Sequence, residues 1–195
     1  MMGRVKEFNE IEALDKATEL FWTKGYNATS ANDLVQFLGL SRSSLYATFG
    51  DKRRLFVRAI DHYRARNVKA VVKMIETSDD LLETIREIFV RSVSQDFLRK
   101  TPKGCLMVNT AIELVPHDEE IAQMVQANEQ DLLHAFEAAI RKGQELDQLT
   151  NRHTASALAN FLYNNLTGLR VSSRARMEKQ ALKDVVELCL SALRK

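Results

Sequence analysis

The sequence predicts an all-α protein of about nine helices, and two observations support this prediction. The 195 residues include only 2 prolines and 7 glycines, so few positions interrupt a helix. Apolar residues also recur with the 3.6-residue period of an amphipathic helix, and no segment indicates a strand. The chain is long enough to combine a small N-terminal module with a larger helical domain.

The first two helices have recognisable ends. The first is expected over about residues 5–24, because Gly25 can adopt the left-handed conformation that ends a helix. The second is expected to begin at Ser30, whose side chain can form a capping box with Asp33, and to end at Gly39. The inward positions of these two helices are Phe8, Ile11, Leu14, Ala17, Leu20, Phe21, Leu34, Phe37 and Leu38.

A short third helix and a long fourth helix follow. Ser41 is a good N-cap for a helix over residues 42–48, and Gly50-Asp51 separates it from a helix over about 51–76. The run 101–104 and Pro116 are clear breaks in the remaining chain. Five further helices are expected over about residues 79–99, 105–115, 118–142, 152–171 and 178–194.

The segment from Ser30 to Leu55 predicts a helix-turn-helix. Its two short helices flank the tight turn Gly39-Leu40-Ser41, and the second helix of such a motif enters the major groove of DNA. Arg42 is expected either to bridge guanine O6 and N7 or to hold a phosphate, and Lys52 suits a phosphate at the start of the fourth helix. The predicted DNA contacts are Thr29, Ser30, Ser41, Arg42, Ser43, Ser44, Tyr46 and Lys52.

Positive charge is concentrated in the N-terminal part of the chain. Residues 1–76 contain 13 Lys and Arg against 9 Asp and Glu, a balance of +4, whereas the remainder contains 15 against 17, a balance of −2. Arg53 and Arg54 are expected to add positive charge beside Lys52. Ordinary solvated surfaces show similar unevenness, so this count supports a phosphate-facing surface without establishing one.

The spacing Tyr-x-x-Phe-x-x-Lys-x-x-Leu at positions 46, 49, 52 and 55 is specific to one family. With Ala28-Thr29-Ser30, Leu34, Gly39-Leu40-Ser41 and Ser44-Leu45-Tyr46, it makes residues 8–63 resemble the DNA-binding domain of the TetR/AcrR family of bacterial transcriptional repressors. Thr48 stands where histidine is common, which alters a phosphate contact, and Phe37 stands where alanine is usual, which indicates local repacking.

The resemblance implies that three successive parts of the chain have different functions. Residues 1–50 would be the helix-turn-helix DNA-binding domain, 51–76 a connecting helix, and 77–195 a regulatory and dimerisation domain. The expected function is that of a repressor that binds double-stranded operator DNA as a homodimer and is released by an unidentified small-molecule effector. The effector pocket is expected to combine apolar and polar side chains. Its candidate residues are Met107, Thr110, Glu113, Met124, Asn128, Phe161 and Asn165.

The last two predicted helices suggest a subunit interface. The helix over 152–171 presents small and polar residues opposite its leucine stripe, and the final helix carries an apolar stripe. The family resemblance implies that two such helices from each subunit form a four-helix bundle. The alternative is that both stripes are intramolecular core. The candidate interface residues are Asn160, Asn164, Gly168, Val171, Leu182, Val185, Val186, Cys189 and Leu193.

Cys105 supports an alternative hypothesis, a regulator that responds to oxidants or electrophiles. It follows Gly104 at an expected helix start, where the helix dipole can lower a thiol pKa, although the preferred interpretation of this cysteine is a small buried hydrophobe. A helical small-molecule carrier or enzyme without DNA function is a further alternative. The chain lacks the Gly-rich phosphate loop, the Cys-x-x-Cys motif and the nucleophile elbow of common enzyme classes.

Several further properties follow from what the sequence lacks. His62, His117, His134 and His153 are scattered, so no metal site and no cofactor are expected. No stretch approaches the roughly 18 apolar residues of a membrane span, and no signal peptide is recognisable. Two cysteines are too few for a disulfide framework and fit a reducing compartment, so a cytoplasmic location without membrane attachment is expected.

Overall fold

The computed structural model describes residues 8–97, 99 and 101–195, and within them it confirms an all-α fold. No described residue forms a strand. The elements are α1 (Glu10–Lys24), α2 (Ala31–Leu38), α3 (Arg42–Phe49), α4 (Lys52–Glu76), α5 (Leu81–Phe97), α6 (Leu106–Leu114), the 3-10 helix η1 (Val115–His117), α7 (Glu119–Glu145), α8 (Ala155–Arg174) and α9 (Lys179–Ser191).

Side-chain caps decide where these helices begin. The first helix starts at Glu10, because the Asn9 side chain accepts hydrogen bonds from the backbone N–H groups of Ile11 and Glu12. The expected start near residue 5 lies outside the described residues, and residues 8 and 9 are not helical. Asp51, Asp118 and Thr154 cap α4, α7 and α8 in the same way.

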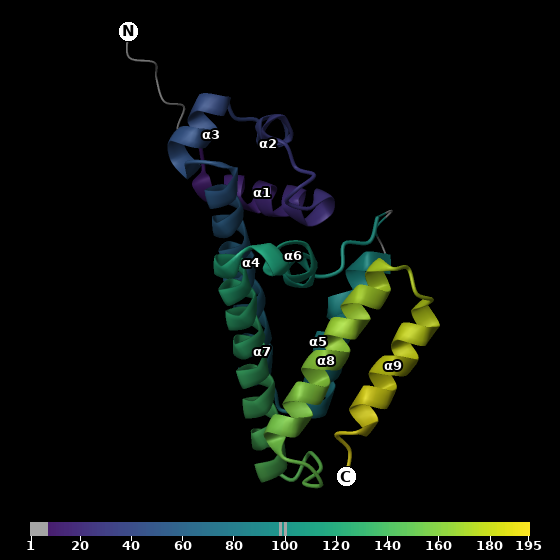
Figure 1. Ribbon diagram of the computed structural model, residues 1–195. Helices are drawn as coiled ribbons and strands as arrows, with labels where there is room; N and C mark the ends of the chain where they lie inside the picture. The colour runs from purple at the N-terminus through teal and green to yellow at the C-terminus, as the bar shows by residue number, and fades with distance from the viewer. Residues whose placement is uncertain (1–7, 98, 100) are drawn as a thin grey trace.

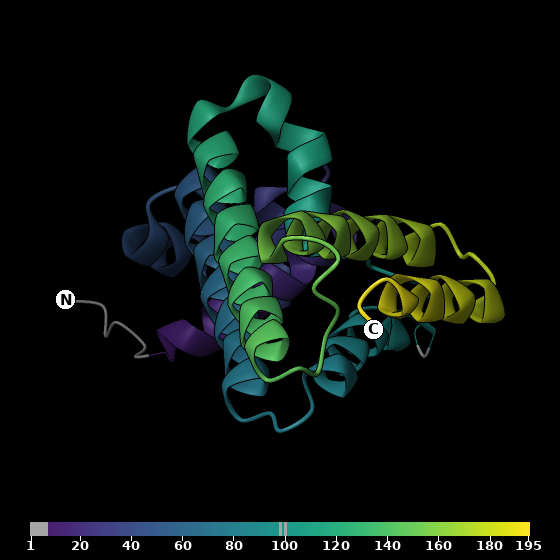
Figure 2. The same ribbon diagram turned by 90° about the horizontal axis from the view of Figure 1, so that it is seen from below.

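The helix-turn-helix lies at one end of the molecule, far from the C-terminus (Figure 1). Helices α1, α2 and α3 form this end, and the long α4 runs from it into the rest of the structure beside α7. Seen from below, α8 and α9 lie side by side, with α9 at the outside of the bundle (Figure 2). Helix α6 lies between the two ends and contacts α1, α4, α7 and α8.

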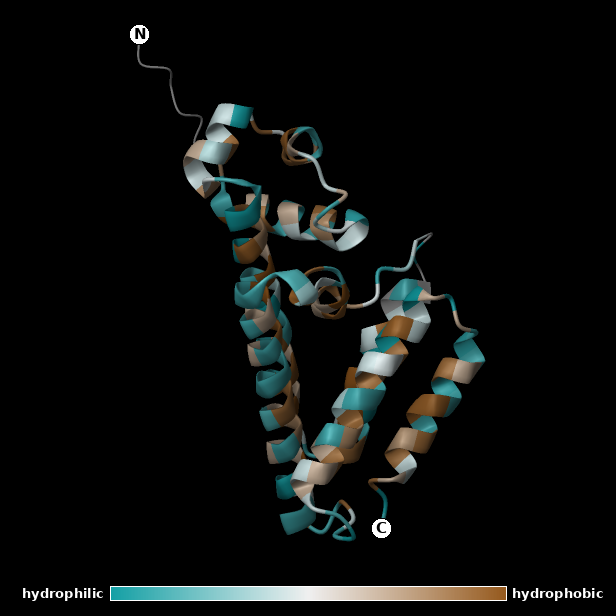
Figure 3. Cartoon of the chain, in the orientation of Figure 1, coloured by the Kyte–Doolittle hydropathy of each residue, from teal (hydrophilic) through white to brown (hydrophobic). Residues whose placement is uncertain are grey.

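Two buried apolar clusters hold the structure together. The N-terminal cluster joins α1 to α4 with α6 and the start of α7, and it includes Phe21, Leu45, Phe56, Leu106 and Ile121. The core of the helix-turn-helix therefore continues directly into α6. Hydrophobic residues line the inner faces of α4 and α7, while hydrophilic residues cover their outer faces (Figure 3).

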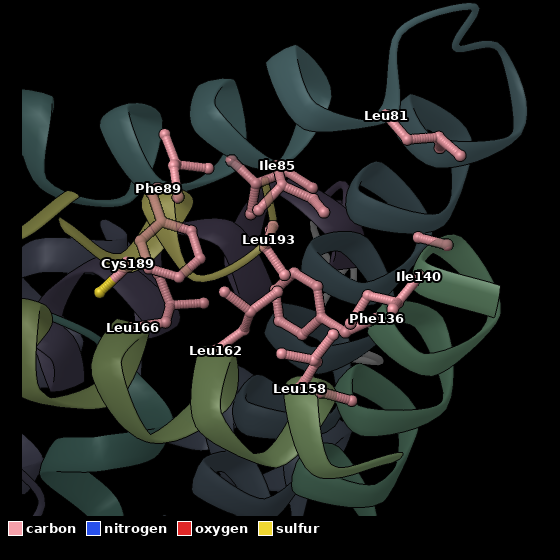
Figure 4. Close-up of a cluster of buried hydrophobic side chains, with 14 of the residues drawn as sticks. Leu81, Ile85, Phe89, Phe136, Ile140, Leu158, Leu162, Leu166, Cys189 and Leu193 are labelled. Atoms are coloured by element: carbon pink, nitrogen blue, oxygen red, sulfur yellow. The ribbon is translucent and has the colours of Figure 1, made fainter. Parts of the chain in front are cut away.

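The C-terminal cluster joins the end of α4 with α5, α7, α8 and α9. Phe136 projects from α7 towards Leu158 and Leu162 of α8, and Leu193 lies beside them (Figure 4). Cys189 and Leu166 lie in the same cluster near Phe89 of α5.

Candidate functional site

Hydrogen bonds around the start of α2 fix the position of this helix, which precedes the turn of the helix-turn-helix. Ser30 and Asp33 form the expected capping box, with Asp33 Oδ2 accepting the Ser30 N–H at 2.7 Å and the Asp33 N–H donating to Ser30 Oγ at 3.1 Å. The Lys24 ammonium group lies 2.6 Å from the same carboxylate. Hydrogen bonds from Lys24, and then from Ser30, hold the pKa of Asp33 well below its usual range. The Asp33 cap therefore stays ionised at neutral pH.

The turn and the start of α3 form the surface expected to meet DNA. Gly39 has a φ of +70°, the left-handed conformation that lets the chain reverse between α2 and α3. Ser41 Oγ then accepts the Ser44 N–H at 3.1 Å, which fixes the first turn of α3. Arg42 and Ser43 are exposed there, and within the described chain Arg42 makes no ion pair. The polar first turn of α3 is therefore free to contact a ligand such as DNA.

Lys52 is a cation held in place by an aromatic ring. Its Nζ lies 4.3 Å from the centroid of the Tyr26 ring, and burial lowers the pKa of the ammonium group from its usual value. No carboxylate of the described residues forms an ion pair with it. A partly desolvated ammonium group at the N-terminus of α4, without an anionic partner, is suited to a phosphate.

Two expectations for this surface are wrong. Thr29 is fully buried, and its hydroxyl group donates to the Gly25 carbonyl oxygen at 2.5 Å, so its side chain has a structural role and cannot touch DNA. Phe37 is not a core residue, because 48% of its surface is exposed on α2. Ser44 and Tyr46 are half-buried, whereas Ser30 and Ser41 are exposed but already used as helix caps.

Arg53 does not add free positive charge beside Lys52. Its guanidinium group binds the Asp118 carboxylate at 3.0 and 3.2 Å and lies 2.7 Å from Glu120, so α7 neutralises it. The hydrogen bonds that Arg53 donates to Glu120, and then to Asp118, raise the pKa of Arg53 further above its usual value. The pair ties the start of α4 to the start of α7.

Glu113 on α6 binds the helix-turn-helix directly. Its carboxylate accepts the backbone N–H groups of Tyr26 at 3.0 Å and Asn27 at 2.7 Å, in the connection between α1 and α2. We call this contact the Glu113 clamp. Sequence reasoning assigned Glu113 to an effector pocket, and no local signal could reveal partners 86 and 87 residues away.

The seven effector candidates are not brought together. Thr110 and Glu113 line a cavity of about 360 Å³ between α1 and α6, together with Trp22. Asn128 is buried within α7, whereas Phe161 is 40% exposed on α8. Met107 is buried, while Met124 and Asn165 are half-buried.

The dimer candidates divide into two groups. Leu182, Val186, Cys189 and Leu193 are at most 3% exposed, because α9 packs on α5 and α8 within one chain. The assignment of these four to a subunit interface is therefore wrong, and Val185 also packs against the same core. The α8 candidates remain exposed; they are Asn160, Asn164, Gly168 and Val171.

Cys105 lies at the start of α6, as expected, but it is only 3% exposed. Its Sγ is 3.8 Å from the hydroxyl oxygen of Tyr63 and 3.6 Å from Nη1 of Arg170. Sequence reasoning missed Arg170, although Leu166 and Leu162 lie one and two helical turns before it on the same face. An arginine on the leucine-rich face of this helix was the observation from which a buried charge could have been predicted.

The described residues lack two features that other classes of function require. No helix there is long and apolar enough to cross a membrane. No group of three or more His, Cys, Asp or Glu side chains in the same residues is arranged to hold a metal ion.

An exposed polar recognition helix on a three-helix module, joined to a larger helical body, defines the class of helix-turn-helix transcriptional regulators. Residues 13–59 match the model described as bacterial regulatory proteins of the tetR family, and residues 82–188 match the one described as the tetracyclin repressor-like C-terminal domain. The chain belongs to the TetR family. It is a DNA-binding transcriptional regulator and not an enzyme, as the sequence predicted.

Individual relatives agree with this assignment. The chain is 35% identical to the uncharacterized HTH-type transcriptional regulator YezE of Bacillus subtilis (strain 168), over 98% of this chain and 100% of YezE. It is 29% identical to the HTH-type transcriptional repressor ComR of Escherichia coli (strain K12), over 98% and 90% of the two chains. A cysteine mutant of the TetR family regulator CifR, solved with a 26-bp double-strand operator DNA, is 28% identical with a TM-score of 0.84, over 98% of this chain and 100% of that one.

Proposed function

We propose that this protein is a ligand-responsive repressor that binds operator DNA as a homodimer and leaves it when a small-molecule effector binds the C-terminal helices. The observation that carries the proposal is the Glu113 clamp together with the shared N-terminal cluster. Through them the helix-turn-helix is joined to α6, which also contacts α7 and α8. A ligand that binds better to one position of α6 therefore changes the population of DNA-competent molecules.

The proposal divides the chain into a DNA-binding domain over residues 1–50, a connecting helix over 51–76 and a regulatory and dimerisation domain over 77–195. Arg42, Ser43, Ser44 and Tyr46 are the proposed DNA contacts of α3, with Lys52 on phosphate. The structure of CifR with its operator supports double-stranded operator DNA as the partner of this protein. The N-terminal cluster extends from α1 into α6, so the two domains share part of their core.

Operator binding is tested with fluorescence anisotropy across a salt series, using DNA from upstream of the protein's own gene and unrelated DNA of equal length. We expect tight binding to the upstream DNA and a preference that persists as salt rises. Weak binding, equal for both DNAs and quickly lost with salt, would leave only phosphate attraction and contradict the proposal.

The homodimer is proposed to form through the exposed face of α8. Asn160, Asn164, Gly168 and Val171 lie on this face, and Leu188 of the adjacent α9 is 69% exposed. Two recognition helices of a dimer meet successive major grooves about 34 Å apart. A Cβ placed at Gly168 meets no heavy atom within 4 Å, so the single chain leaves space above this position.

Replacing Gly168 by arginine is expected to convert the dimer to a monomer and to weaken operator binding about 100-fold, because the two modules no longer bind as one unit. Light scattering after size-exclusion chromatography measures the mass, and anisotropy measures the binding. Gln126→Arg, an exposed substitution on α7, is the matched control. A Gly168→Arg protein that remains dimeric would place the interface elsewhere.

A further inference from the structure

Arg170 is a buried cation without an anionic partner. The residue is 7% exposed, and within the described part of the chain its guanidinium group contacts one side-chain acceptor, Cys105 Sγ at 3.6 Å from Nη1. No carboxylate there lies within ion-pair distance of it. Burial of a charge is costly unless an opposite charge compensates for it, so the position favours an anion.

The neighbouring carboxylate is already occupied. Asp96, which is 7% exposed, accepts the backbone N–H groups of Lys103 at 2.8 Å and Gly104 at 3.0 Å, and the Ser173 hydroxyl group at 2.6 Å. These three bonds hold the segment before α6 against α8. They leave Arg170, one helical turn before Ser173, without a carboxylate.

The surroundings of Arg170 provide two further features suited to an anion. Helix α6 begins at Cys105 without a side-chain cap, so its first backbone N–H groups and the positive end of its dipole lie close to the guanidinium group. Tyr63 places its hydroxyl oxygen 3.8 Å from Cys105 Sγ. Burial, and then the nearby Cys105, raise the pKa of Tyr63 above its usual value, so the hydroxyl group stays protonated and can donate.

We propose that Arg170, the start of α6 and the Tyr63 hydroxyl group form an anion-binding site for a small organic acid. The carboxylate of the acid supplies the counter-ion that Arg170 lacks, and its apolar part packs against the N-terminal cluster, in which Met107 is buried and Met124 half-buried. That this acid is the effector rests on the proposed function. The class of ligand rests on the buried guanidinium group, the uncapped start of α6 and the Tyr63 hydroxyl group, and does not depend on the proposed function.

The first test needs no ligand. Arg170→Met keeps much of the side-chain length and removes the charge, so the ligand-free protein is expected to melt about 3 °C higher or more. Arg174→Met, one turn further along α8 and exposed, is the matched control and should leave the melting temperature nearly unchanged. A lower melting temperature for Arg170→Met would show that the guanidinium group is needed by the fold, and would overturn the proposal.

The second test uses defined acids at constant ionic strength. Formate, benzoate and octanoate are compared with benzamide and octanamide by thermal shift. We expect a saturable rise in melting temperature with at least one acid, none with the amides, and none with any of them in Arg170→Met. Equal effects of acids and amides, an effect that survives in Arg170→Met, or no effect of any acid would each overturn the proposal, because formate fits any site for a carboxylate.

Cys105→Ser distinguishes an anionic ligand from a thiolate counter-ion. The variant is expected to keep the response to the acids that the wild-type protein shows. A response that appears only in Cys105→Ser would mean that Cys105, and not an added acid, is the partner of Arg170 in the wild-type protein, and would overturn the proposal. Operator binding of the ligand-free wild-type protein is measured separately by anisotropy. Failure to bind operator would refute the proposed function, whereas the thermal shifts would still decide whether the anion site exists.

Discussion

Replacing Lys52 by methionine is expected to weaken operator binding about 100-fold without changing the fold. The ammonium group lies over the Tyr26 ring and has no ion-pair partner among the described residues, so a phosphate would be its principal partner. A dimer carries two copies. The slope of log K against log salt should therefore become shallower by about 1.8, and anisotropy titrations at several salt concentrations measure both quantities.

Lys69→Met is the matched control, because Lys69 is an exposed lysine on the same helix, away from the helix-turn-helix. It should leave both the affinity and the salt slope nearly unchanged. If Lys52→Met binds operator as tightly as the wild-type protein, Lys52 is held for packing on Tyr26 and does not contact phosphate.

Replacing Phe136 by alanine is expected to lower the free energy of unfolding by about 3–5 kcal/mol. The ring is fully buried in the C-terminal cluster, between α8 and the end of the chain, and its centroid lies 6.5 Å from that of Phe89 (Figure 4). Truncation leaves a cavity that close-packed neighbours fill only in part. Urea unfolding followed by circular dichroism measures the loss.

The same substitution at an exposed phenylalanine is the control, because it removes the same side chain without opening a cavity in the core. Phe37→Ala, at a residue 48% exposed on α2, should cost less than about 1 kcal/mol. A loss at Phe136 as small as that at Phe37 would mean that the C-terminal cluster is not packed as the structure describes it.

Local patterns were sufficient to predict the fold. The capping box of Ser30 and Asp33, the cap at Ser41 and the glycine at 39 depend on residues close in sequence, and the structure shows each of them. Other ends were displaced by a few residues; α8, for example, runs over 155–174 where 152–171 was expected, and its cap Thr154 was not recognised. Asn9, which caps the first helix, was not recognised as a cap.

Long-range partners were the part that the sequence could not predict. A 3.6-residue period shows that a helix has an apolar face but not what covers it, and the stripe of α9 with Cys189 proved to be covered by its own chain. The backbone partners of Glu113 and Thr29 were missed for a related reason. Their polar groups bind backbone atoms, in the case of Glu113 far away in sequence, and residue type alone does not distinguish this from a functional contact.

Helix α6 has a mechanical consequence. It spans nine residues, about 13 Å, with Cys105 preceding its first turn and Glu113 in its last. A rigid rod of that length converts a tilt of about 10° into a displacement of about 2 Å at its far end. Because the Glu113 carboxylate holds two consecutive amides, that displacement acts on the connection between α1 and α2 as a pull at a single point.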